Sequence, residues 1–125
     1  MENLVRAASE LVGEFQLYNE WTMAGAVGCA LETAAGNVYT GINIDLLCGV
    51  GFCAEHAAVA EMLKHRETQI RKIVAVTSQG VVPPCGRCRE MLLQVDRKNT
   101  KTLVAVEPAN IVQLSELVPH HWLNP

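Results

Sequence analysis

Two short cysteine-containing motifs hold the residues best suited to chemistry in this chain. The first is Cys53-Ala54-Glu55, and the second is Pro84-Cys85-Gly86-Arg87-Cys88. Each motif is expected where a loop opens a helix. A helix N-terminus favours thiolate over thiol because its free N–H groups carry a partial positive charge. Two such termini pointing at one spot would form a nest of thiolates suited to a zinc ion.

The spacing of the cysteines predicts a metal site with three protein ligands. Cys85 and Cys88 are three residues apart, so both can reach one metal from the first turn of one helix. Cys53 would come from the other helix and leave the fourth coordination position open. Three protein ligands plus water is the arrangement of catalytic zinc, whereas structural zinc sites usually close all four positions. Glu55, two residues beyond Cys53, is placed to take a proton from a water at the metal without being a ligand.

The two motifs together resemble the signature of zinc-dependent base deaminases, in which a metal ligand precedes x-Glu and Pro-Cys-x-x-Cys follows. A cysteine before Ala54-Glu55 makes the sequence similar to the cytidine deaminase family, in the tetrameric branch with three cysteine ligands. The likeness continues along nearly the whole chain. It includes the segments Val27-Gly28-Cys29-Ala30-Leu31, Gly36-Asn37-Val38-Tyr39 and Gly41-Ile42-Asn43-Ile44-Asp45.

This resemblance implies one Zn²⁺ per subunit, with Cys53, Cys85 and Cys88 as its ligands and Glu55 as the general acid and base. Glu55 would take a proton from the attacking water and give one to N3 of the pyrimidine. Hydroxide would add at C4, and the tetrahedral centre would expel ammonia. The implied reaction converts the 4-amino group of a cytosine nucleoside or analogue to a carbonyl, as in the conversion of cytidine to uridine.

The same resemblance assigns the substrate contacts and the assembly. Asn43, and after it Asp45, would face the sugar, while the backbone of Ala54 would help to hold the pyrimidine edge. The branch of the family implies a homotetramer whose active sites borrow residues from neighbouring subunits. The fold it implies is a three-layer α-β-α sandwich with a mixed five-stranded sheet, forming a single domain over residues 1–125.

Three positions depart from the ordinary family pattern. Gly25 stands where an aromatic side chain is common, Asp45 replaces a longer glutamate, and His56 replaces the arginine that usually follows Cys-Ala-Glu. Three thiolates on Zn²⁺ leave a net negative charge that a nearby cation should offset. Arg87 is the first candidate for this role, with His56 as an auxiliary. The departures resemble blasticidin S deaminase, so the alternative substrate is blasticidin S or another modified cytosine.

Composition agrees with a small-molecule enzyme. The chain has 125 residues, of which 50% are hydrophobic, and a formal net charge of −3. No basic run suggests binding to nucleic acid. No signal peptide or apolar stretch of roughly 20 residues is present, so we expect no membrane association and a cytoplasmic location. Five cysteines in a reducing compartment favour metal or redox chemistry over a disulfide framework.

The elements that must position the motifs follow from hydrophobic periodicity. An amphipathic helix is predicted from Leu4 to Phe15, and two later helices from Ala54 to about Lys64 and from Gly86 to about Val95. A last short helix is predicted over residues 112–117. Four strands are predicted over residues 27–31, 38–42, 73–76 and 103–106. The last two of these are continuous apolar runs, which is typical of strands buried on both faces.

Two alternative functions remain at this point. Cys85-Gly86-Arg87-Cys88 after a strand also fits a thiol–disulfide oxidoreductase, although that hypothesis leaves Cys53-Ala54-Glu55 without a role. A noncatalytic binding module stabilised by zinc would keep the cysteines but would have no need of Glu55.

The remaining cysteines, histidines and tryptophans have simpler interpretations. Cys29 and Cys48 are interpreted as small buried hydrophobic residues or inert thiols. His120 and His121 are interpreted as a polar tail, and both tryptophans, Trp21 and Trp122, as core or subunit-contact residues.

Overall fold

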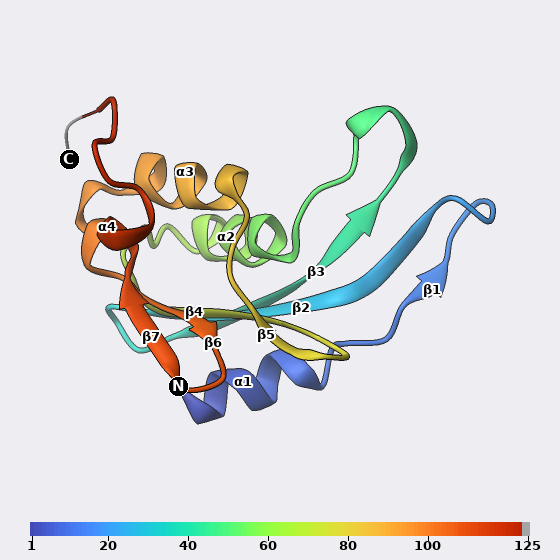
Figure 1. The fold of residues 1–125 in the computed structure, drawn as a ribbon, viewed down its shortest axis with the longest axis horizontal. Helices are drawn as coiled ribbons and strands as arrows, with labels where there is room; N and C mark the ends of the chain where they lie inside the picture. The colour runs from blue at the N-terminus through green and yellow to red at the C-terminus, as the bar shows by residue number, and fades with distance from the viewer. Residues whose placement is uncertain (124–125) are drawn as a thin grey trace.

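The computed structural model describes residues 1–123, so the last two residues of the predicted 1–125 domain lie outside the described part. Helix α1 (Glu2–Ser9) packs on one face of a mixed β-sheet. Helices α2 (Ala54–Lys64) and α3 (Gly86–Val95) cover the opposite face (Figure 1). A short α4 (Leu114–Leu117) follows the last strand. The predicted three-layer α-β-α arrangement is therefore confirmed.

The sheet is built on five strands in the order β3-β2-β4-β6-β7. They are β2 (Met23–Thr33), β3 (Val38–Asp45), β4 (Ile70–Thr77), β6 (Leu103–Glu107) and β7 (Asn110–Gln113). Two short strands extend it, since β1 (Phe15–Gln16) pairs with β2 and β5 (Gly80–Val82) pairs with β4. Strands β4 and β6 are parallel, and the other pairs are antiparallel. The mixed five-stranded sheet is confirmed, and in the described residues it grows to seven strands.

The core lies on both faces of the sheet. On β4, Ile73 belongs to the cluster under α2 and α3, whereas its neighbour Val74 belongs to the cluster under α1. The paired residues of β2, Leu31 and Ala30, alternate in the same way. A strand buried on both faces needs apolar residues at every position, which explains the unbroken hydrophobic run.

Two predicted boundaries were wrong. The first helix ends at Ser9, and Phe15 lies instead in β1, because the N–H of Gly13 bonds to the Gly25 carbonyl and turns the chain onto β2. The predicted last helix was too long, because residues 112–113 pair with β6 as part of β7. Helix α4 begins only after Gln113, where Gln113 and Glu116 form a reciprocal capping box.

One glycine lets α2 lie unusually close to the sheet. A Cβ atom at Gly41 of β3 would meet the backbone nitrogen of Ala58 at 2.5 Å and the carbonyl oxygen of Ala54 at 2.8 Å. Both are backbone atoms of α2, so neither can rotate away. The lack of a side chain at Gly41 therefore sets the depth at which the start of α2 is held. No helix in residues 1–123 is both long enough and apolar enough to span a bilayer.

We predict that Gly41→Ala pushes α2 outward and lowers the free energy of unfolding by about 1–3 kcal/mol, the usual cost of overpacking. Urea unfolding measures this change. Gly13→Ala is the matched control, because a Cβ atom there meets nothing within 4 Å and its φ is not positive. Equal stability of Gly41→Ala and Gly13→Ala would contradict the close packing of α2.

Candidate metal centre

Both cysteine motifs lie at helix N-termini, as predicted. Cys53 is the N-cap of α2 and Cys85 is the N-cap of α3, and both have extended backbone angles. The loop before Cys53 is fixed by two hydrogen bonds between the backbones of Ile44 and Phe52, which return the chain to the end of β3. The two helices therefore begin beside one another on the same face of the sheet (Figure 1).

The three sulfur atoms of the predicted site converge. Cys53 Sγ lies 3.5 Å from Cys85 Sγ, and Cys85 Sγ lies 3.6 Å from Cys88 Sγ. Two sulfur ligands of a tetrahedral zinc with 2.3 Å bonds lie about 3.8 Å apart. Three cysteines from two distant segments thus stand at nearly the spacing that one zinc ion requires, so this donor set fits the metal.

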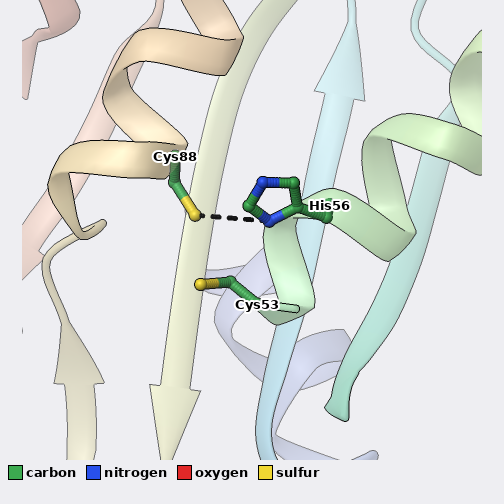
Figure 2. Close-up of side chains that lie close together, drawn as sticks. All are labelled: Cys53, His56 and Cys88. Carbon is green, nitrogen blue, oxygen red and sulfur yellow. Dashed lines mark hydrogen bonds between the residues drawn. The ribbon is translucent and has the colours of Figure 1, made fainter. Parts of the chain in front are cut away.

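A fourth donor stands next to these sulfurs. His56 Nδ1 lies 3.8 Å from Cys88 Sγ, and the ligand atoms of Cys53, His56 and Cys88 all lie within 4.8 Å of one another (Figure 2). The imidazole ring is also stacked on Phe52, with ring centroids 6.1 Å apart. The sequence analysis assigned His56 only an auxiliary role. The structure places it close enough to be a partner or a ligand.

A signal for His56 was present in the sequence. Residues three apart at the start of a helix lie on the same face. Cys53 and His56 have this spacing on α2, just as Cys85 and Cys88 have it on α3. Each helix therefore presents its N-cap residue and the residue three positions later to the same point.

The environment of the thiols differs from one to the next. Burial raises the pKa of Cys53 and raises the pKa of Cys88 far more, with the charge of Glu55 adding to the effect on Cys88. Burial also acts to raise the pKa of Cys85, but hydrogen bonds from the Cys88 N–H, from the thiols of Cys53 and Cys88 and from the Arg87 N–H together outweigh it, and the net shift is downward. Cys85 ionises most easily, and a cation is needed to hold the other two as thiolates.

Glu55 is a buried acid at the centre of this cluster. Its side chain is on the first turn of α2 and only 5% of the residue is exposed. Burial raises its pKa above the ordinary value, although hydrogen bonds from its own backbone and from the Cys88 thiol partly oppose the shift. A carboxyl group whose neutral form is favoured is suited to giving and taking protons near neutral pH.

A cavity of about 520 Å³ opens directly above the metal centre. Its lining includes Cys53 and Cys85 but neither His56 nor Cys88. It is also lined by the residues predicted to contact substrate, by the predicted base and by the residue predicted to offset the thiolate charge: Asn43, Asp45, Ala54, Glu55 and Arg87. The sequence analysis missed Phe52 and Pro83 of the lining, although each is next to a motif. The structure thus brings every predicted site residue to one place.

Asn43 has a structural role that the sequence did not reveal. The strand β2 is irregular between Ala24 and Gly28, which takes the N–H of Val27 out of the β-ladder. Asn43 Oδ1 accepts a hydrogen bond from this N–H at 2.9 Å, and the residue is 6% exposed. With its oxygen engaged, the Asn43 side chain keeps its amide N–H groups for a ligand in the cavity.

Arg87 faces the cavity. Its Nη1 donates to the carbonyl of Gly51, which also lines the cavity, at 3.5 Å. Arg87 was the first candidate for offsetting the thiolate charge. The structure instead places the Nδ1 atom of His56 beside Cys88 Sγ, whereas Arg87 Nη1 donates to a backbone carbonyl. Arg87 still acts on the centre by its charge, because it lowers the pKa of His56 after the larger effect of burial.

Other candidate residues lie outside the site. Cys29 is fully buried, as predicted, whereas Cys48 is exposed in the 3₁₀ turn η1 (Leu47–Gly49), so of its two interpretations only the inert thiol remains. Trp21 and Trp122 are 65% and 73% exposed, so neither is a core residue of this chain, and their role as subunit contacts stays a prediction. His121 is no loose tail residue, since its Nε2 lies 2.9 Å from both carboxylate oxygens of Glu90.

Comparison with known proteins agrees with this geometry. Residues 2–105 match the family model described as the cytidine and deoxycytidylate deaminase zinc-binding region. The chain is 32% identical to a cytidine deaminase of Mycobacterium tuberculosis over 96 residues, covering 75% of this chain and 70% of that one. It is 33% identical to a blasticidin-S deaminase of Bacillus cereus over 76 residues, covering 53% and 54%.

Solved structures of cytidine deaminases share the fold of this chain. A crystal structure of the cytidine deaminase from Mycobacterium tuberculosis superposes with a TM-score of 0.80 at 26% identity, covering 97% of this chain and 95% of that one. The similarity therefore includes the elements outside the two cysteine motifs.

We predict that Asn43→Ala lowers the free energy of unfolding by about 1–3 kcal/mol, because it leaves the buried N–H of Val27 without an acceptor. Asn43→Asp keeps an oxygen at this position and should recover part of the loss. Urea unfolding of the three proteins tests the expectation. Wild-type stability in Asn43→Ala would show that water replaces the lost acceptor.

Proposed function

The chain belongs to the cytidine and deoxycytidylate deaminase family, and we propose that it removes the 4-amino group of a cytosine nucleoside or analogue as ammonia. It is a zinc-dependent hydrolytic deaminase. The observation that carries the proposal is the buried Glu55 carboxyl beside converging cysteine sulfurs at a cavity floor. We propose further that residues 1–125 form one such domain.

We propose that Cys53, Cys85 and Cys88 hold the zinc ion and that His56 donates its Nδ1 hydrogen to Cys88. The sulfur spacings of 3.5 and 3.6 Å support this ligand set. When bound, zinc supplies the Lewis acidity that brings the pKa of a water near 7. His56 does not line the cavity, so its place off the metal leaves the cavity side open to that water.

The charge of the site supports distinct roles for its two basic residues. Three thiolates and one Zn²⁺ sum to −1, which weakens Lewis acidity unless neighbouring groups offset it. The His56 N–H would draw charge from Cys88 by direct contact. Arg87, which lines the cavity, would offset the negative charge at longer range and would face the substrate.

Glu55 would carry the protons of the reaction. In its ionised form it accepts a proton from the attacking water, and as the acid it then protonates N3 of the pyrimidine. Glu55 then takes the proton of the new hydroxyl at C4 and passes it to the amino group, so that the C4–N bond breaks, the C4 carbonyl forms and ammonia leaves. Asn43 would orient the sugar through its amide N–H groups, Asp45 would bind a sugar hydroxyl, and the Ala54 backbone would hold the base edge.

The substrate alternative, blasticidin S or another modified cytosine, is supported by a departure from the family pattern at Gly25 and by one relative. Gly25 has a φ of +87°, and a Cβ atom there would meet the carbonyl oxygen of Gly13 at 2.7 Å. The aromatic side chain common in the family is thus incompatible with this backbone. Gly25 is not among the residues that line the cavity, so this difference marks a departure from the family pattern and not a wider pocket, and the alternative rests on the similarity to the Bacillus cereus blasticidin-S deaminase.

We also propose a cytoplasmic homotetramer that acts in pyrimidine salvage. Large apolar side chains are exposed on β1, on the loop between β1 and β2, and on the segment that follows β3. A subunit interface would cover them. They include Phe15, Leu17, Tyr18, Trp21, Leu47, Val50 and Phe52.

The oxidoreductase alternative fits the sulfur geometry less well. Cys85 Sγ lies no closer to Cys88 Sγ, its partner in a Cys-x-x-Cys motif, than to Cys53 Sγ. A dithiol mechanism uses two sulfurs and gives the third no role, whereas a metal centre uses all three.

We predict that Cys53→Ser, Cys85→Ser and Cys88→Ser each reduce bound zinc well below one ion per chain, as measured by elemental analysis after dialysis. Cys48→Ser, a change at an exposed thiol away from the cluster, should keep a full complement. His56→Leu should also retain zinc. Zinc retained by Cys85→Ser and lost by His56→Leu would instead assign the ligands to Cys53, His56 and Cys88.

We predict that Glu55→Gln retains zinc but loses about 10²–10⁴-fold in turnover, the usual worth of a positioned acid–base group. Cytidine, deoxycytidine and blasticidin S form the substrate panel, and loss of the 4-amino chromophore with ammonia release is the measurement. Glu61→Gln is the control, because Glu61 is on the same helix but pairs with Lys64 at the surface. No turnover of any compound by the wild type would refute the deaminase assignment.

A further inference from the structure

We propose that Arg89 is a positioning residue that holds the zinc-binding turn of α3 against the end of α4. The inference rests on the proposed zinc site and adds a residue that the reaction itself does not use. Arg89 directly follows Cys88 and is partly buried. Its guanidinium donates to two backbone carbonyls that are far apart in the sequence, those of Pro84 and Leu117.

The first carbonyl belongs to the residue immediately before a ligand. Arg89 Nε donates to Pro84 O at 2.8 Å, and Pro84 is itself buried. The backbone N–H of Arg89 also bonds to the carbonyl of Cys85 at 3.0 Å. Two consecutive carbonyls of the turn, Pro84 and Cys85, are therefore both held by Arg89. The direction of the Cys85 side chain depends on the backbone angles between these two groups.

The second carbonyl is an anchor outside the site. Arg89 Nη1 donates to Leu117 O at 3.4 Å, at the last residue of α4, where helix carbonyls have no partner within the helix. Leu114 of α4 is fully buried, and Leu117 packs against the same core cluster. The end of α4 is thus a fixed point, and Arg89 transmits its position to the Pro84–Cys85 turn.

The choice of arginine follows from this geometry. A planar guanidinium can donate from Nε and Nη1 in two fixed directions, whereas a lysine ammonium concentrates its donors at one atom. Among residues 1–123, no carboxylate forms an ion pair with Arg89. Its hydrogen bonds to carbonyls are therefore its main interactions, which suits a structural tie better than a surface charge.

Residues that orient metal ligands typically contribute 10–100-fold to metal affinity. Loss of the tie should let the Pro84–Cys85 turn shift, so that the sulfur of Cys85 no longer stays at its spacing from Cys53 and Cys88. We expect Arg89→Gln to weaken zinc binding by about this factor. Arg89→Lys, which can reach one carbonyl at a time, should give an intermediate affinity.

The experiment measures zinc affinity by competition with a chromophoric chelator and follows the thiolate-to-metal charge-transfer band of the cobalt-substituted protein. Arg71→Gln is the control, because Arg71 also donates to a backbone carbonyl, Ala34 O at 2.8 Å, but at the start of β4 beside the turn between β2 and β3. We expect Arg71→Gln to keep wild-type affinity and band intensity. Arg89→Gln should lose affinity and lower the band, and Arg89→Lys should restore part of both.

Two results would overturn the inference while leaving the proposed function intact. The first is wild-type zinc affinity in Arg89→Gln, and the second is an equal loss in Arg89→Gln and Arg71→Gln. If Arg89→Gln fails to fold, Arg89→Lys alone decides, and wild-type affinity in that variant counts against the tie. Failure of the wild-type protein to bind zinc at all would instead refute the proposed zinc site.

Discussion

The N-termini of α2 and α3 meet on one face of the sheet, and each begins at a cysteine. Three sulfurs are thereby held within 3.6 Å of a neighbour, partly out of reach of water. Burial raises the pKa of Cys53 and Cys88, whereas hydrogen bonds from helix N–H groups and from the two neighbouring thiols lower the pKa of Cys85. Ionising all three thiols is unfavourable unless a cation binds between them. Metal affinity therefore follows from the meeting of these two helix N-termini.

Contacts with the sheet and with neighbouring segments hold the two helix N-termini in place. Gly41 lets α2 approach β3, and the parallel pair β4 and β6 requires the crossover that α3 supplies. The far end of α3 is fixed by Asn99, which is fully buried. Asn99 Oδ1 accepts from the N–H of Ile70, and its Nδ2 donates to the carbonyl oxygens of Thr68 and Leu92. One amide thus joins α3 to the start of β4, while Arg89 joins the other end of α3 to α4.

The parts of this structure that were predictable are those determined by local sequence. Helices α2 and α3 begin and end where predicted, because their N-cap cysteines and runs of helix-forming residues act within each segment. Strands β1, β5 and β7 were not found, because such short segments become strands only by pairing with a neighbour. The hydrogen bonds of Asn43 and Arg89 join residues 16 and 28 positions apart, so no local pattern announces them. His56 could have been found, since it repeats on α2 the spacing that identified Cys88 on α3.

That repeated spacing gives the site four donors in two pairs, Cys53 with His56 and Cys85 with Cys88, so the protein must leave one of them off the metal if water is to bind. Charge alone does not choose, since a neutral imidazole is as acceptable to zinc as a thiolate. The sulfur spacings favour the three cysteines, because Cys85 Sγ lies 3.5 Å from Cys53 Sγ and 3.6 Å from Cys88 Sγ. Cys53, Cys85 and Glu55 also line the cavity, whereas His56 and Cys88 do not. A ligand set of three cysteines, as proposed, would direct the open position toward the cavity and Glu55 and would leave the imidazole to stabilise the buried thiolate of Cys88.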